Sequence, residues 1–127
     1  MNAQIIVADD DENIADLLGE YLSSRQHRVS VVYDGFQLAQ KAAELRPHLI
    51  ITDVLMPCAH DFSVYQVLQK DPRTQGIPIL FISGHPLEQI KDIIPNDSKT
   101  RFLQKPLSFS VLEKCIQELL TLGGCAP

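Results

Sequence analysis

Short apolar runs alternate with segments of helical period along this chain of 127 residues. The apolar runs are rich in β-branched residues and predict five strands, at 4–8, 29–33, 49–52, 77–82 and 101–104. Between and after them the apolar period is helical, and it predicts five helices, over 12–22, 36–45, 62–70, 86–94 and 109–122. This alternation predicts a doubly wound α/β fold, in which helices cover both faces of a five-stranded parallel sheet.

Local sequence signals indicate where the predicted helices begin and end and which side of each helix faces the core. Asp11 is a candidate N-cap for the first helix, and Pro47 follows the end of the second. The apolar face predicted for the first helix consists of Ile14, Leu17, Leu18, Tyr21 and Leu22. The face predicted for the last helix consists of Val111, Leu112, Cys115, Ile116, Leu119 and Leu120. We expect one domain over 1–122, followed by a flexible tail over 123–127.

Composition and charge narrow the class of protein. The net charge of -5, without a cluster of Lys or Arg, argues against direct nucleic-acid binding. The longest apolar run is well short of the roughly 18–20 residues that span a bilayer, and the N-terminus has no charged signal-peptide lead. The cysteines are widely spaced and odd in number, so they suggest neither a zinc site nor a disulfide framework. We therefore expect a soluble, cytoplasmic protein.

Polar side chains stand at the ends of four predicted strands. Asp9 and Asp10 follow the first strand, Asp53 the third, Ser83 the fourth and Lys105 the fifth. In an open parallel sheet these ends share one edge, which is where ligands bind. Neighbouring carboxylates repel by on the order of a few kcal/mol per pair at an effective dielectric constant of ~20. A divalent cation with a preference for oxygen, such as Mg²⁺, would relieve this repulsion.

The hydroxyl and the ammonium group at the same edge suit an anionic ligand beside the metal. Together the groups predict a site that takes up a phosphoryl group on a carboxylate, with Asp53 as the in-line nucleophile. Mg²⁺ and Lys105 would neutralise the charge of the equatorial phosphoryl oxygens.

These residues resemble the receiver domain of two-component response regulators, a chemotaxis-regulator-like module. The resemblance extends from Ile5 to Leu120 and rests on Asp9-Asp10, Asp53-x-x-Met56-Pro57, Ser83-Gly84 and Lys105-Pro106. It implies a flavodoxin-like sheet with the strand order 2-1-3-4-5. It also implies Mg²⁺-dependent transfer of a phosphoryl group from the phosphohistidine of a histidine kinase to an aspartate.

The resemblance implies a role for each matching residue. Asp53 would accept the phosphoryl group, and Asp9 and Asp10 would hold Mg²⁺ together with Asp53 and the backbone carbonyl of Leu55. A domain of this kind catalyses its own phosphorylation and dephosphorylation and has no separate substrate, so it is a signalling module rather than an enzyme.

The resemblance also implies a switch. Ser83 would move its hydroxyl to the phosphoryl group, Lys105 would pair with it, the Lys105-Pro106 bond would be cis, and Phe102 would turn inward. The implied partners are a sensor histidine kinase or phosphotransfer protein and a downstream protein that reads the altered surface.

Several features depart from the family pattern and leave alternatives open. Asp61 stands where the family usually has glycine, and Ser98-Lys99 replaces the usual Gly-Ala. One alternative is a degenerate receiver that binds partners without phosphorylation. Another is an aspartate-nucleophile phosphohydrolase, but Leu55 occupies the position of its second acid. A flavodoxin-like cofactor binder is a third, and the acidic loop at 9–11 would repel a flavin phosphate.

Overall fold

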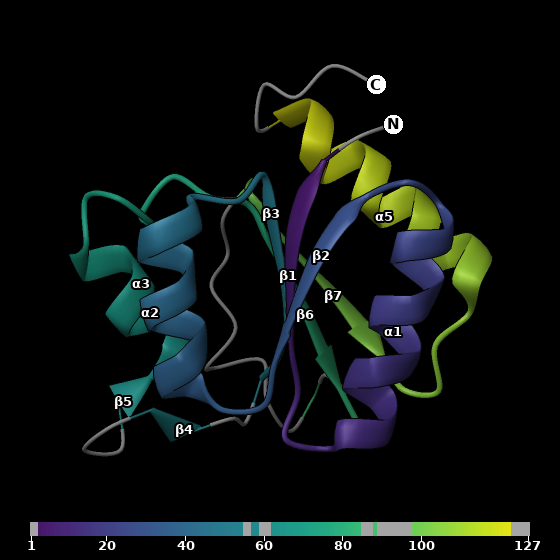
Figure 1. Cartoon of the computed structure of the whole chain (residues 1–127), viewed down its shortest axis with the longest axis horizontal. Helices are drawn as coiled ribbons and strands as arrows, with labels where there is room; N and C mark the ends of the chain where they lie inside the picture. The colour runs from purple at the N-terminus through teal and green to yellow at the C-terminus, as the bar shows by residue number, and fades with distance from the viewer. Residues whose placement is uncertain (1–2, 55–56, 59–61, 85–87, 89–97, 123–127) are drawn as a thin grey trace.

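A parallel sheet of five strands forms the centre of the molecule (Figure 1). The computed structural model describes residues 3–54, 57–58, 62–84, 88 and 98–122. The strand order is β2-β1-β3-β6-β7, which is the predicted order 2-1-3-4-5 for the five parallel strands. Their bounds are β1 Gln4–Ala8, β2 Arg28–Val32, β3 Leu49–Asp53, β6 Ile79–Ser83 and β7 Thr100–Gln104.

Helices cover both faces of this sheet, as the alternation predicted. In Figure 1, α1 and α5 lie to the right of the sheet and α2 and α3 to the left. Their bounds are α1 Glu12–Ser24, α2 Gly35–Leu45, α3 Val64–Lys70 and α5 Phe109–Leu122. The helix predicted over 86–94 falls almost entirely outside the described residues, and the tail over 123–127 does so completely. None of the helices in the described part of the chain could cross a membrane.

Strand residues alternate between two apolar clusters, one on each face of the sheet. On the α1 and α5 face, strand residues such as Ile5, Val7 and Ile51 pack against Leu18 and Ile116. On the other face, strand residues such as Ile6, Ala8 and Ile50 pack against Leu38 of α2 and Leu68 of α3. This period of two, with both faces buried, explains why the strands appear in the sequence as continuous apolar runs.

The predicted apolar faces of α1 and α5 are too wide. Leu17 is 54% exposed and Val111 is 46% exposed, although the helical period assigned both to the core. The buried face of α1 consists instead of Ala15, Leu18, Gly19 and Leu22. A helix packed on a sheet covers only the centre of its apolar stripe, so residues at the margin stay in solvent.

A short antiparallel ribbon corrects the prediction of a loop at 58–61. Strand β4, Pro57–Cys58, pairs with β5, Phe62–Ser63, so Cys58 belongs to a strand. Strands of two residues have no measurable period, which is why the sequence pattern did not reveal them.

Candidate functional site

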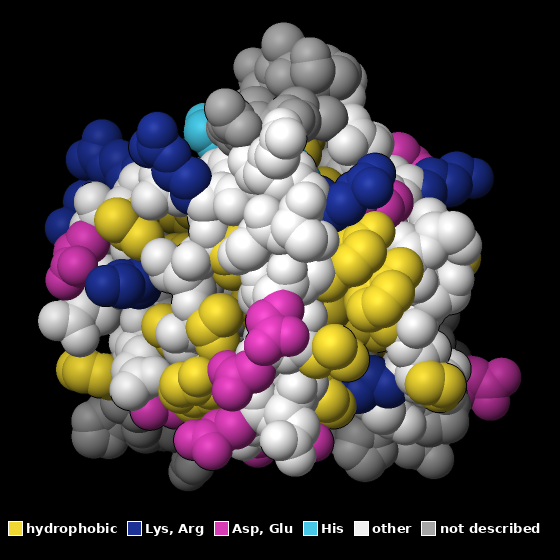
Figure 2. All heavy atoms as spheres, turned by 45° about the vertical axis from the view of Figure 1, so that its right-hand side comes forward, with side chains coloured by type: hydrophobic (Ala, Val, Ile, Leu, Met, Phe, Trp, Pro, Cys, Tyr) yellow, Lys and Arg dark blue, Asp and Glu magenta, His cyan; other side chains and the backbone are white. Residues whose placement is uncertain are grey.

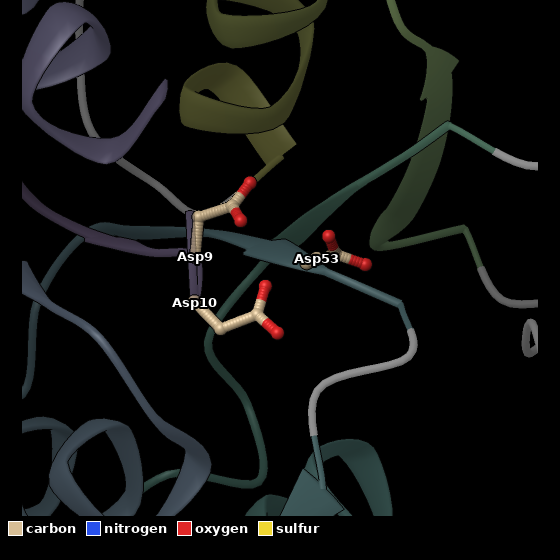
Figure 3. A group of neighbouring side chains, drawn as sticks. All are labelled: Asp9, Asp10 and Asp53. Atoms are coloured by element: carbon tan, nitrogen blue, oxygen red, sulfur yellow. The ribbon is translucent and has the colours of Figure 1, made fainter. Parts of the chain in front are cut away.

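Three carboxylates meet at the carboxyl ends of β1 and β3 (Figure 3). Asp9 and Asp10 directly follow β1, and Asp53 is the last residue of β3. Each can offer one oxygen such that the three oxygens lie within 4.8 Å of one another. The parallel ladder between β1 and β3, which pairs Ala8 with Thr52, brings these acids together from distant parts of the sequence.

Lys105, which follows the edge strand β7, contacts two of these acids. Its Nζ donates hydrogen bonds to Asp9 Oδ2 at 2.9 Å and to Asp53 Oδ2 at 3.1 Å. The backbone places it there, because Lys105 N–H donates to the Ser83 carbonyl at 2.7 Å directly after β7. Of the predicted site residues, Asp9, Asp10, Asp53 and Lys105 are therefore neighbours.

Burial sets the protonation behaviour of Asp9 and Lys105. Asp9 is fully buried, and this burial raises the pKa of its carboxyl group, although hydrogen bonds from Lys105 and from the Asp11 backbone act in the opposite direction. Burial lowers the pKa of the Lys105 ammonium, but its hydrogen bonds to Asp9 and Asp53 outweigh that effect and the net shift is upward. Lys105 thus remains a cation, and the Asp9 carboxylate is costly unless positive charge stays beside it.

A backbone amide orients the Asp9 carboxylate, and further hydrogen bonds hold the chain beside the acids. Asp11 N–H donates to Asp9 Oδ1 at 2.9 Å, while the Asp11 side chain caps α1 by accepting from the amides of Asn13 and Ile14. Next to Asp53, the buried Thr52 Oγ1 donates to the Asp53 carbonyl at 3.2 Å. The N-cap of Asp11 was predicted from sequence, but its amide bond to Asp9 was not, because a contact between residues two apart leaves no periodic signal.

The structure describes all but one of the remaining predicted site and switch residues. Ser83 is fully buried at the end of β6, beside the strand that ends in Asp53. The Lys105-Pro106 bond is cis, as the resemblance implied. Phe102 is half-buried and packs against the apolar cluster on the α2 and α3 face. Leu55, expected to offer a backbone carbonyl to the metal, lies outside the described residues.

The acidic cluster fits a hard divalent cation. Mg²⁺ prefers oxygen ligands, uses one or two carboxylates and keeps several waters. Asp10 is exposed, whereas Asp9 is buried, so the cluster has one side open to water and one side enclosed by protein. Asp9, Asp10 and Asp53 are the residues that could hold such an ion.

Comparison with known proteins agrees with this arrangement. The family model described as the response regulator receiver domain matches residues 5–117. The DNA-binding dual master transcriptional regulator RpaA of Synechocystis is 32% identical over 119 residues, which are 92% of this chain and 48% of that protein. The response regulator PleD of Caulobacter vibrioides is 33% identical over 121 residues, 94% of this chain and 26% of that protein. The chain thus spans half or less of the length of these two relatives.

Solved structures show the same fold. A response regulator from Desulfuromonas acetoxidans superimposes with a TM-score of 0.83 at 23% identity, covering 94% of this chain and 97% of that one. The chemotaxis response regulator CheY4 of Vibrio cholerae gives a TM-score of 0.76 at 22% identity, covering 94% and 99%. With the sheet order, the acidic strand ends and the family match in agreement, the chain belongs to the response regulator receiver domain family of two-component signalling.

Proposed function

We propose that Asp53 is the phosphoryl acceptor of this receiver domain and that the acidic cluster holds Mg²⁺. One observation supports the proposal above the others: three carboxylates lie within 4.8 Å at the strand ends, and Lys105 Nζ touches two of them. One lysine does not balance three neighbouring carboxylates, and the surplus negative charge is repulsive unless a cation binds there.

The chain's own residues supply the geometry of the transfer. A carboxylate oxygen of Asp53 forms the new P–O bond while the P–N bond to the donor imidazole breaks, and the electron pair of that bond stays with the nitrogen. Lys105 is already within hydrogen-bond distance of Asp53, so a small movement of its ammonium group would place it on a phosphoryl oxygen. Asp9, Asp10 and Asp53 would hold Mg²⁺. The resemblance implies the backbone carbonyl of Leu55, which lies outside the described residues, as a further ligand. When bound, Mg²⁺ neutralises charge on the transferring phosphoryl oxygens.

The proposed switch begins at Ser83. An acyl phosphate adds about -1.5 to -2 charges and strong acceptor oxygens. The Ser83 hydroxyl, at the end of the strand next to Asp53, would turn toward those oxygens and draw its loop with it. Phe102 packs from the edge strand β7 and would move into the space released. The altered surface would then be read by a protein partner.

The proposed donor is the phosphohistidine of a histidine kinase or of a phosphotransfer protein. In this scheme the domain transfers the group to itself and later releases it with water, without a separate substrate.

The proposal is tested by intact mass after incubation with acetyl phosphate and Mg²⁺. The wild-type chain is expected to gain one phosphoryl group, and Asp53→Asn is expected to gain none, because the amide cannot act as the nucleophile. Asp16→Asn makes the same chemical change on the exposed surface of α1 and should gain the group like the wild type.

Two results would contradict this assignment. If Asp53→Asn gains the phosphoryl group to the wild-type level, another residue is the acceptor. A wild-type chain that gains no group, even though Mg²⁺ is present and the protein is folded by circular dichroism, would favour the degenerate receiver that binds without phosphorylation.

A further inference from the structure

The edge strand β2 leaves hydrogen-bonding groups of its backbone open. Among the described strands it pairs only with β1. Two hydrogen bonds show which residues of β2 bond to β1. Arg28 N–H donates to the Ala3 carbonyl at 2.9 Å, and the Val32 carbonyl accepts from Asp9 N–H at 3.3 Å. In a parallel pair, every second residue bonds to the neighbouring strand.

Two of the three residues between these positions therefore direct their backbone groups outward. Val29 and Val31 alternate with the bonded residues, so their amide and carbonyl groups point away from β1, toward the open edge. The next outward amide, that of Tyr33, already donates to Gln37 Oε1 at 3.0 Å. The open stretch is thus short and has a defined end, with two amides and two carbonyls available to an added strand.

A groove accompanies this edge on the α1 face of the sheet. It has a volume of about 590 Å³ and is lined by residues of α1 and β2, among them Asp16, Gly19, Glu20 and Val31. Because Gly19 has no side chain, α1 comes close to β2 there. The Tyr33 hydroxyl donates to Asp16 Oδ1 at 2.7 Å, so Tyr33 bounds the groove at the end nearer the acidic site.

A second groove of about 370 Å³ follows the same edge on the α2 face. Its lining includes the amide side chains of Gln37 and Gln40 and the opposite charges of Lys41 and Glu44. Side chains of an added strand would alternate between the two grooves. The α2 groove suits neutral polar side chains, since its two charges offset each other.

The α1 groove differs from the α2 groove in that its lining is acidic. Asp16 and Glu20 are both exposed on its rim, without a Lys or Arg among the residues that line it. Figure 2 brings the α1 side of the molecule forward and shows acidic side chains along the middle of this face, with hydrophobic patches to either side. An occupant with Lys or Arg at every second position would meet both acids.

The same acids oppose pairing between two copies of this chain. Antiparallel pairing of two β2 edges about a two-fold axis would place both α1 helices on one face of a continuous sheet. The rim with Asp16 and Glu20 would then face its own copy, and like charges would repel. Charges of this kind are a common device against edge-to-edge association.

We propose that β2 is a docking edge for an extended basic segment of a partner protein, which adds to the sheet beside Val29 and Val31 and places its Lys or Arg side chains against Asp16 and Glu20. Backbone bonds would supply affinity, and the acidic groove would select the sequence. This surface is separate from the strand-end acids, so the inference stands independently of the phosphoryl acceptor.

The test uses a synthetic peptide of about seven residues in which lysine alternates with threonine, so that lysine faces the α1 groove and a neutral polar side chain faces the α2 groove. Titrated into the isotopically labelled wild-type chain, it is expected to shift the amide resonances of Val29 and Val31 most strongly. A peptide with glutamate in place of lysine, and one N-methylated on the residues that face the edge, should shift neither.

Matched variants test whether the acidic side chains of the α1 groove contribute to peptide binding. Glu20→Gln is expected to weaken binding of the lysine peptide by up to roughly fivefold, the upper end for one exposed ion pair. Glu118→Gln makes the same change on α5 and should bind like the wild type, as should Asp53→Asn.

Three outcomes would overturn the proposal. They are the absence of shifts at Val29 and Val31, equal binding by Glu20→Gln and the wild type, and self-association through β2 in sedimentation that the lysine peptide does not reverse.

Discussion

The Lys105 ammonium shares its hydrogen bonds between Asp9 and Asp53, and this division has two opposite effects on the proposed site. It offsets the charge of a buried acid, which stabilises the fold. It also competes for the same carboxylates with any cation that binds there. One residue is thus expected to favour phosphoryl transfer and to weaken metal binding.

Lys105→Met separates these effects. We expect Mg²⁺ to bind roughly threefold to tenfold more tightly, because a neighbouring positive charge is removed from its ligands. Phosphoryl uptake at saturating Mg²⁺ is expected to fall by about a hundredfold, the usual loss for one charge that stabilises the transferring group. Calorimetric titration measures the first quantity and intact mass against time the second.

Lys41→Met is the control, since it removes an exposed lysine of α2 and should alter neither quantity. Weaker Mg²⁺ binding by Lys105→Met, in a protein that urea unfolding shows to be folded, would contradict the proposed competition.

At the scale of elements, the contact between α1 and β2 depends on one missing side chain. A Cβ added to Gly19 would lie 2.7 Å from Val31 Cγ2, closer than real carbon contacts allow. The helical period of α1 showed which side faces the sheet. It could not show how closely the helix approaches, because that distance depends on the partner strand.

Gly19→Ala is therefore expected to destabilise the chain, although alanine is the better helix former. The clash should cost about 1–3 kcal/mol, as overpacking in a closely packed interior does, against a gain of up to about 1 kcal/mol in helix propensity. Urea unfolding measures the difference. Val31→Ala in the Gly19→Ala background should recover part of the loss by making room, and an unchanged loss in that double variant would refute the contact as its cause.

The sequence predicted the order of elements and the acids at the strand ends, because strand ends are marked by a change from apolar to polar residues. Asp9, Asp53 and Lys105 could be placed at one edge for this reason alone. Leu17 and Val111 were assigned to the core because the period identifies a stripe, whereas coverage of its margins depends on neighbouring elements. Contacts such as that of Gly19 with Val31 depend on geometry between elements, which the sequence pattern does not contain.

At the scale of the whole molecule, two histidines secure the end of the sheet opposite the acids. His27 Nδ1 accepts from Ala3 N–H at 3.3 Å, and His48 Nδ1 accepts from Gln4 N–H at 2.9 Å. Both bonds anchor the start of β1, the strand that leads to Asp9. His27 is buried, and this burial lowers the pKa of its imidazole.

This lowered pKa predicts a loss of stability in mild acid. Below the unfolded value of about 6.5 the unfolded chain binds a proton that folded His27 resists. The stabilising contribution is complete above that pH and is lost as the pH falls toward the lower folded pKa. Thermal unfolding of the wild type and of His27→Gln, whose side-chain oxygen can accept from the same amide without titrating, should diverge between pH 7 and pH 5. If the unfolding temperatures of the two proteins change in parallel over this range, His27 is not the cause of the loss of stability in acid.

The hydrogen bond between Lys105 and Asp9 joins residues 96 positions apart. During synthesis Asp9 and Asp53 emerge from the ribosome long before Lys105. A chain that ends before Lys105 therefore has the proposed nucleophile, Asp53, without the ammonium group that pairs with it. Lys105 reaches the acids only after β7 has been synthesised and has joined the sheet, so products truncated before Lys105 are not expected to accept a phosphoryl group.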